Sequence, residues 1–92
     1  MKITVKAFAT LRDAFGGRGF LTIELPEGSS IEDLIRELQN LFKLKAELVD
    51  LGESTSNIKI LVNGREIRYL EGVKTKLKDG DVVAFIPPVG GG

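Results

Sequence analysis

The chain opens on alternating apolar and polar side chains. In "KITVKAFA", Ile3, Val5 and Ala7 alternate with two lysines and a threonine, which is the period-2 pattern of a strand with one buried face. Phe8 follows on the polar side of that alternation. A first strand with an apolar residue on its outer face is therefore predicted here.

The segment "FLTIELP" alternates in the same way. Either Phe20 or Leu21 joins Ile23 and Leu25 on the buried face, and Pro26 ends the pairing because proline cannot donate to a strand ladder. The sequence "FGGRG" supplies the turn before it. The first two strands therefore form a hairpin.

A helical period replaces the alternation in "EGSSIEDLIRELQNLF". The apolar residues recur at steps of three and four, which predicts a helix with one buried stripe formed by Ile31, Leu34, Ile35, Leu38 and Leu41. Ser30 is the expected N-cap, with Glu32 and Asp33 at the positive end of the helix dipole. Ser29 is the alternative cap, and with Glu32 it would form a capping box.

The second half of the chain returns to strands. Residues 43–57 could form a short second helix that ends at Gly52 and is followed by a polar loop. In "IKILVNGREIRYL" an Asn-Gly pair separates two alternating runs, which predicts strands over 58–62 and 65–68 joined by a type I′ turn. After a loop through Gly72, "LKDGD" forms a tight turn into the last strand, "VVAFIPP", which Pro87 and Pro88 end.

The order of elements predicts the fold class α+β. A mixed sheet of four to five strands, with one main helix packed across one face, satisfies the rule that layers of secondary structure bury each other's apolar faces. The first and last strands are expected to be parallel neighbours in the middle of the sheet. All 92 residues form a single domain, 1–92, in which 87–92 is a projecting C-terminal tail.

Composition narrows the function. The chain has no cysteine and no histidine, which removes disulfides, zinc and iron–sulfur ligation, thiol nucleophiles and the usual general base, so neither a metal site nor an enzyme is expected. The 13 acidic and 13 basic side chains balance, so the charge gives no reason to expect a nucleic-acid partner. Without an apolar signal or a stretch of transmembrane length, a cytoplasmic protein with no membrane partner is expected.

Two local motifs favour structural roles. "GGRG" lacks the lysine and hydroxyl residue of a phosphate-binding loop, so a hairpin turn is the better interpretation. Glu32, Asp33 and Glu37 lie off the apolar stripe, which favours a solvated helix face over a catalytic carboxylate pair.

The C-terminal "FIPPVGGG" is the most distinctive stretch. Two prolines hold the backbone extended and cannot donate ladder hydrogen bonds, so the chain leaves the sheet stiffly. The residues after them, Val89, Gly90, Gly91 and Gly92, reach about 13 Å when extended. Three glycines make this reach slender enough to enter a narrow channel. The tail would present the carboxylate of Gly92 to a separate activating enzyme, and the alternative of a cloning remnant does not explain the prolines.

These residues resemble the ubiquitin-like sulfur carriers of the MoaD type, the small subunit of molybdopterin synthase, and their archaeal relatives, which include the small archaeal modifier proteins. The similar segments are "FATLRDAFG", "SSIEDLIREL", "ILVNGREI" and "LKDGDVVAFIPPVGGG". The family usually has Ala, Ser or Thr where this chain has Gly90. The resemblance implies a ubiquitin-like β-grasp fold.

It also implies a chemistry for the tail. Pro87, Pro88, Val89, Gly90 and Gly91 would thread into an E1-like adenylyltransferase of the MoaB/ThiF-like class and MoeB type, which would use ATP to adenylate Gly92; no cofactor would be bound by the chain itself.

A sulfur donor would then convert the adenylate into a thiocarboxylate. The acceptor would be the large subunit of molybdopterin synthase, of the MoaE type, or another sulfur acceptor such as a tRNA-thiolating enzyme. In the archaeal relatives lysines of target proteins can capture the adenylate instead, which would make the chain a protein modifier. A third alternative is a module that only binds partners through its sheet.

Strand parity predicts where a partner docks. If Val5, Val62 and Phe85 point toward the helix, then Phe8, Leu61, Ala84 and Ile86 point to the opposite face, where the chain has no further element to cover them. An exposed apolar patch of this kind marks a protein-binding surface, with Arg12 and Arg65 as candidate rim contacts.

Overall fold

The computed structural model describes residues 1–8, 12, 15–17, 19–42 and 58–87. The expected short helix within 43–57 and the tail residues 88–92 lie outside them. The elements are β1 (Lys2–Ala7), β2 (Phe20–Glu24), α2 (Ile31–Phe42), β3 (Lys59–Val62), β4 (Arg65–Glu66), two 3₁₀ turns (Ile67–Tyr69 and Gly72–Lys74) and β5 (Val82–Ile86). No helix in this described part is long and apolar enough to cross a membrane.

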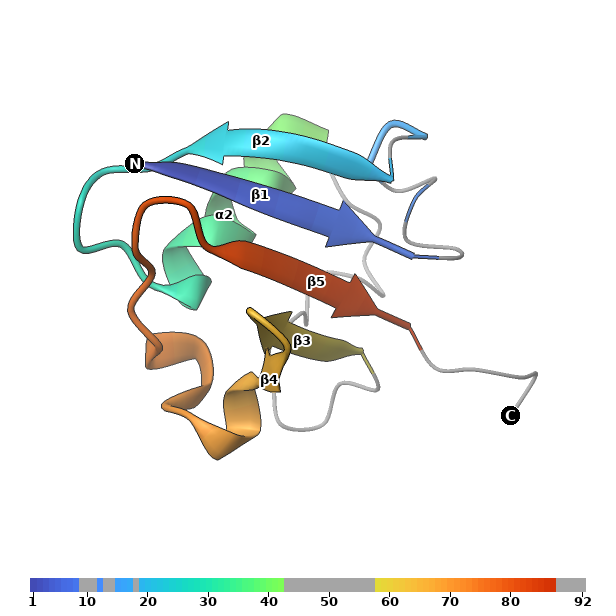
Figure 1. Ribbon diagram of the computed structural model, residues 1–92. Coiled ribbons are helices and arrows are strands. Elements are labelled where there is room, and N and C mark those ends of the chain that lie inside the picture. Colours follow the sequence, from blue (N-terminus) through green and yellow to red (C-terminus); the bar gives the residue numbers. More distant parts are fainter. Residues whose placement is uncertain (9–11, 13–14, 18, 43–57, 88–92) are drawn as a thin grey trace.

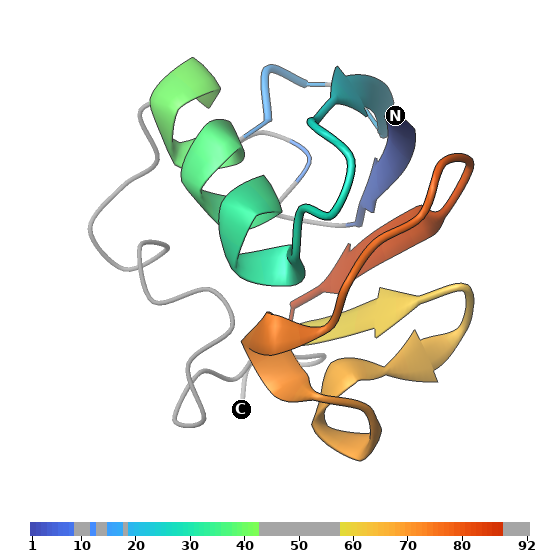
Figure 2. The same cartoon turned by 90° about the vertical axis from the view of Figure 1, so that its left-hand side faces the viewer.

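The five strands form one mixed sheet in the order β2-β1-β5-β3-β4. β1 pairs with β2 antiparallel and with β5 parallel, so the first and last strands are neighbours in the middle of the sheet, as the sequence predicts (Figure 1). α2 lies across one face only (Figure 2). The fold class is therefore α+β, with the ubiquitin-like β-grasp arrangement of one helix on a mixed five-stranded sheet.

The core lies between α2 and the facing side of the sheet. Alternate residues of β1, β5 and β3 point into it, which confirms the predicted strand parity. The buried apolar residues are Ile3, Val5, Ala7, Phe15, Ile23, Leu25, Ile31, Leu34, Ile35, Leu38, Ile60, Val62, Ile67, Leu77, Val83 and Phe85.

The prediction that Leu41 belongs to the buried stripe of the helix is wrong. Leu41 is 53% exposed, whereas Phe42 is partly buried and packs against the core. Phe42 follows Leu38 by four residues, so it continues the stripe one turn further along the same face. Its ring lies 5.6 Å from that of Phe15, centroid to centroid, so the last residue of α2 packs against the core.

Ser30 caps α2, as predicted, but its partner is Asp33. The Asp33 amide donates to the Ser30 hydroxyl at 3.4 Å, and the Ser30 amide donates to the Asp33 carboxylate at 2.9 Å. This reciprocal pair is a capping box at N-cap and N3. The alternative cap, Ser29, instead donates its hydroxyl to the Pro26 carbonyl at 2.7 Å.

The Asn-Gly hairpin forms where it is predicted. Asn63 and Gly64 take φ values of 50° and 86°, as a type I′ turn requires. The predicted strand 65–68 is too long, because β4 ends at Glu66 and Ile67–Tyr69 forms a 3₁₀ turn. Ile67 is buried, so the chain bends at this residue to bring its side chain into the core.

The "LKDGD" turn joins β5 to the start of β1. The Asp79 carboxylate accepts the Lys2 amide at 2.7 Å, and the Gly80 amide donates to the Lys2 carbonyl at 2.8 Å. The Asp81 carboxylate accepts the Lys78 amide at 2.8 Å and the Asn63 side-chain amide at 3.0 Å. The turn thereby fixes the register of the three central strands.

Candidate functional site

The sheet face opposite α2 carries the predicted patch in two adjacent rows. Ala84 of β5 lies between Lys6 of β1 and Leu61 of β3. In the next row Ile86 is paired with Lys59, and the Phe8 amide donates to the Phe85 carbonyl at 3.4 Å, which extends the β1–β5 register to place Phe8 beside Ile86. The structure thus brings the four predicted apolar residues together.

Exposure varies across these rows. Phe8 is 44% exposed, whereas Leu61, Ala84 and Ile86 are half-buried. Phe8 is therefore the most exposed apolar group of the four. We call the side chains of both rows the open face.

Phe20 belongs to the open face as well. The sequence left Phe20 and Leu21 as alternatives for the buried side of β2, and the pairing of Lys6 with Phe20 and of Val5 with Leu21 decides between them. Leu21 packs against the core, while Phe20 is 65% exposed. The Lys6 ammonium lies 5.6 Å from the centroid of the Phe20 ring, a cation–π contact.

The root of the tail is anchored in the core. Phe85 is fully buried, and its ring lies 5.7 Å from that of Phe15 in an edge-on arrangement. Pro87 is buried too. The predicted tail, 87–92, thus begins at a buried proline, and Pro88, Val89, Gly90, Gly91 and Gly92 lie outside the described residues.

The two predicted rim arginines lie in different places. Arg12 is exposed, and its guanidinium covers Gly19, so that a Cβ on Gly19 would be 3.5 Å from the Arg12 Nε. This position borders Phe20. Arg65 is exposed and is paired with Val62, whose side chain faces the core, so strand parity puts Arg65 on the helix side of β4. It also lines a hollow beside Leu61, so its role at the rim of the open face stays a prediction.

A hollow of about 500 Å³ adjoins the open face at β3 and β4. Arg68 braces its margin through an ion pair with Glu66 at 2.8 Å and a cation–π contact with Tyr69 at 5.5 Å. Tyr69 is 77% exposed. Sequence analysis assigned this segment to a strand and so missed it. The lining residues are Leu61, Gly64, Arg65, Glu66, Tyr69 and Leu70.

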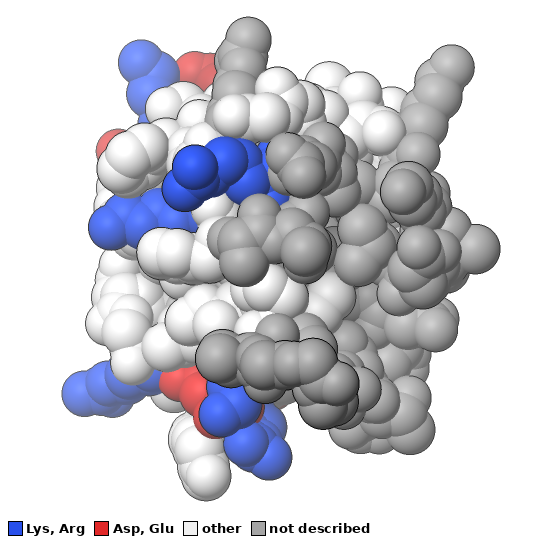
Figure 3. Space-filling model, turned by 90° about the vertical axis from the view of Figure 1, so that its right-hand side faces the viewer, with Lys and Arg blue, Asp and Glu red and all other residues white. Residues whose placement is uncertain are grey.

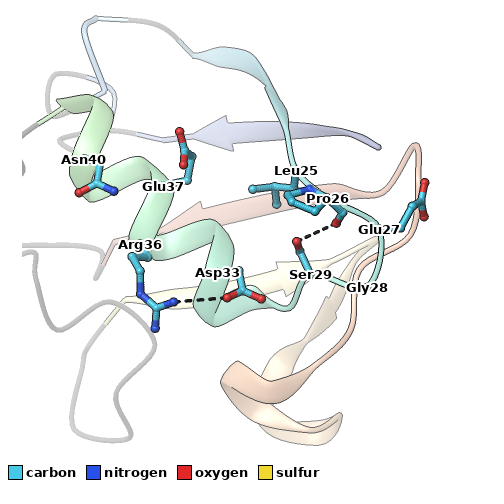
Figure 4. A pocket seen from close by; sticks show the side chains of 9 residues that line it. All are labelled: Leu25, Pro26, Glu27, Gly28, Ser29, Asp33, Arg36, Glu37 and Asn40. Atoms are coloured by element: carbon cyan, nitrogen blue, oxygen red, sulfur yellow. Dashed lines mark hydrogen bonds and ion pairs between the residues drawn. The ribbon is translucent and has the colours of Figure 1, made fainter.

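Another pocket, of about 430 Å³, lies on the other side of the molecule between α2 and the loop before it (Figure 4). Two of the charges that line it are paired with each other, because Arg36 contacts the Asp33 carboxylate at 3.4 Å. Hydrogen bonds from the Ser30 amide and hydroxyl hold the pKa of Asp33 below its ordinary value of 3.8. Among the described residues no group of three or more acidic, histidine or cysteine side chains could hold a metal ion.

Comparison with known proteins agrees with this geometry. The model of the ThiS family matches residues 5–92. Over the full length of both proteins, the chain is 33% identical to small archaeal modifier protein 3 of Haloferax volcanii. It is 28% identical, over 100% of this chain and 99% of the other, to the molybdopterin synthase sulfur carrier subunit of Mycobacterium tuberculosis.

A solved structure shows the same fold. The solution structure of small archaeal modifier protein 1 from Methanosarcina acetivorans superposes with a TM-score of 0.76 and 34% identity, covering 99% of this chain and 96% of that one. The family match spans both the open face and the glycine tail, and the chain belongs to the ThiS family of ubiquitin-like sulfur carriers.

Proposed function

We propose that the chain is a carrier protein acting in the cytoplasm, whose terminal Gly92 carboxylate is activated by a separate E1-like enzyme. The carboxylate oxygen attacks the α-phosphate of ATP and displaces pyrophosphate, which gives an acyl-adenylate. A sulfur donor then displaces AMP and leaves a thiocarboxylate. In molybdopterin biosynthesis the thiocarboxylate sulfur attacks an activated carbon of the cofactor precursor in the pocket of the large subunit of the synthase. Hydrolysis of the resulting thioester leaves the sulfur on that carbon and restores the carboxylate of Gly92.

The observation that carries this proposal is the position of the open face beside a rigid tail root. Ile86 faces outward at the last position of β5, between two buried neighbours, Phe85 and Pro87. A partner that covers Ile86 and Phe8 would therefore hold the start of the tail in a fixed direction. Activation needs such positioning because ordering the reacting groups accounts for much of a catalytic barrier.

The first test uses the tail. Deleting Gly91 and Gly92 should abolish adenylation, measured as ATP–pyrophosphate exchange by the E1-like enzyme of the same organism, while the circular dichroism spectrum stays unchanged because the described core ends at Pro87. Exchange that persists after the deletion would rule out Gly92 as the activated residue. A module that only binds partners would be unaffected.

The second test uses the open face. Replacing half-buried Ile86 by aspartate puts an unpaired charge into the proposed contact and should raise the KM of the carrier by about tenfold, the equivalent of about 1.4 kcal/mol. Leu41→Asp is the matched control, since Leu41 is 53% exposed on α2. An equal effect of both substitutions would show that Ile86 does not dock the enzyme.

A second candidate is a protein modifier joined to lysines through Gly92. It is supported by the full-length similarity to small archaeal modifier protein 3. Both candidates share the adenylate and differ in what captures it. Intact mass measurement of protein from the native host separates them: a carrier shows a free chain in which one sulfur has replaced one oxygen, and a modifier shows conjugates heavier by the mass of target proteins.

A further inference from the structure

The end of the open face from which the tail leaves carries cations on both sides of β5. β1 and β5 run toward this end, and β2 and β3 begin there. Lys6 is the neighbour of Ala84 on one side, and Lys59 is the neighbour of Ile86 on the other. Two strand spacings separate β1 from β3, so the two lysines flank the exit of the tail about 10 Å apart across the strands.

These two cations have no carboxylate partner within the described part of the chain. The ion pairs found there involve the N-terminus, Arg36, Arg68 and Lys74. Lys59 is exposed, and Lys6 is half-buried because it lies over the Phe20 ring. Both ammonium groups are therefore available to an external anion.

The carboxylates of the open face lie elsewhere. Glu24 is paired in register with Lys2 at the far end of β1 and β2, and Glu66 is held by Arg68 at 2.8 Å. Arg12, which covers Gly19 next to Phe20, adds a third cation near the exit. Seen from this end, basic side chains lie above and below an uncharged area, and acidic atoms adjoin the basic ones in both groups (Figure 3).

The neutral total charge of the chain thus conceals a local asymmetry. The exit of the tail is an apolar strip, formed by Phe8, Ala84 and Ile86, between two cations. Its complement is a protein surface with an apolar centre and carboxylates on both sides. A phosphate backbone would match the cations but would leave the strip against a charged chain, and so fits less well.

We propose that Lys6 and Lys59 recognise paired acidic side chains on the activating enzyme, at the rim of the channel that receives the tail. This inference rests on the proposed function. The lysines guide the carrier into register, with Ile86 at the centre of the contact, and do not take part in the chemistry at Gly92. They are positioning residues, so their loss should raise KM in a salt-dependent way and leave kcat unchanged.

The test measures ATP–pyrophosphate exchange with the E1-like adenylyltransferase of the same organism and the full-length chain as substrate. In low salt, Lys6→Glu with Lys59→Glu should raise KM by about tenfold and leave kcat unchanged. The difference should shrink to about twofold or less in 1 M NaCl, where the Debye length falls from about 10 Å at 0.1 M to about 3 Å.

Two control variants isolate the charge and its position. Lys6→Arg with Lys59→Arg keeps both charges and should keep the KM of the original chain. Lys74→Glu with Lys78→Glu makes the same change in net charge on exposed residues, one at the end of the 3₁₀ turn Gly72–Lys74 and one in the loop before β5, and should change KM by less than about twofold. Melting curves confirm that all variants are folded.

The outcomes separate the two proposals. If the original chain is not adenylated, the proposed function fails. If it is adenylated but the Lys6 and Lys59 variant has an unchanged KM, or one raised no more than in the Lys74 and Lys78 variant, the paired-acid inference fails alone. Transfer RNA binding that is lost in the Lys6 and Lys59 variant, with an unchanged KM for adenylation, would assign the cations to a nucleic acid and would also overturn it.

Discussion

Phe15 offers the sharpest test of how the root of the tail is held. Its side chain is fully buried between Phe42 of α2 and Phe85 of β5, with ring centroids 5.6 and 5.7 Å away. Replacing a core phenylalanine by alanine costs about 3–5 kcal/mol in lost transfer energy and cavity formation. A domain of this length has a total stability of about 5–14 kcal/mol, so Phe15→Ala should remove a large share of it.

A second substitution at Phe15 separates the contribution of the two ring contacts from that of the buried apolar volume. Phe15→Leu keeps most of the buried apolar volume but loses both ring pairs, each worth about 0.5–1.5 kcal/mol, so it should cost about 1–3 kcal/mol. Urea denaturation followed by circular dichroism measures both variants, and the midpoint should fall without a change in m.

Phe20→Ala is the matched control for the same chemical change at an exposed site. Phe20 is 65% exposed and contacts the Lys6 ammonium, so its loss should cost no more than about 1 kcal/mol. If Phe15→Ala costs no more than Phe20→Ala, the packing of Phe15 against Phe85 does not hold the end of β5. The account of a rigid tail root would then be wrong.

Three further predictions concern local structure. Ser30→Ala removes the hydroxyl of the capping box and should lower the free energy of unfolding by about 1 kcal/mol in urea titrations; no change would argue against the cap. The pKa of Asp33 is lowered in the folded state, so the ionised carboxylate stabilises the fold fully above the ordinary pKa of 3.8, and this stabilisation is lost as the pH falls through the folded pKa. In Asp33→Asn the melting temperature should therefore fall less steeply with decreasing pH in the acid range, and parallel profiles for the two proteins would contradict this. Gly64→Ala should lower the free energy of unfolding by about 1–2 kcal/mol in thermal or urea unfolding, because Gly64 has a φ of 86°. A Cβ there would meet no atom within 4 Å, so the loss would come from the backbone conformation, and a neutral substitution would disprove the type I′ turn.

Local pattern was sufficient for most of the elements. The alternation of Ile3, Val5 and Ala7 determines which face of β1 is buried, because successive side chains of a strand point to opposite sides. The Asn63 and Gly64 pair determines a turn, because few other residues accept positive φ at both positions. These signals are contained within a few consecutive residues, and the structure confirms them.

Where the local pattern left two neighbouring residues as candidates for the buried position, a contact with a distant part of the chain selects one of them. Phe20 and Leu21 are equally suited to the inner face of β2, and the pairing with β1 selects Leu21. Leu41 and Phe42 are both apolar, and the Phe15 ring, from the segment between β1 and β2, selects Phe42. Neither choice can be read from the residues on either side.

The sequence by itself therefore determined the elements, the family resemblance and the glycine tail, because periodicity, turn residues and the motifs along the chain are local properties. Only the tertiary structure decided that Pro87 is buried and that Lys6 and Lys59 lie on either side of Ile86 and Ala84. The reason is the parallel pairing of β1 with β5, which joins residues nearly a whole chain length apart. The charge around the tail is a consequence of that pairing, since it brings a lysine from each half of the chain to the same end of the sheet.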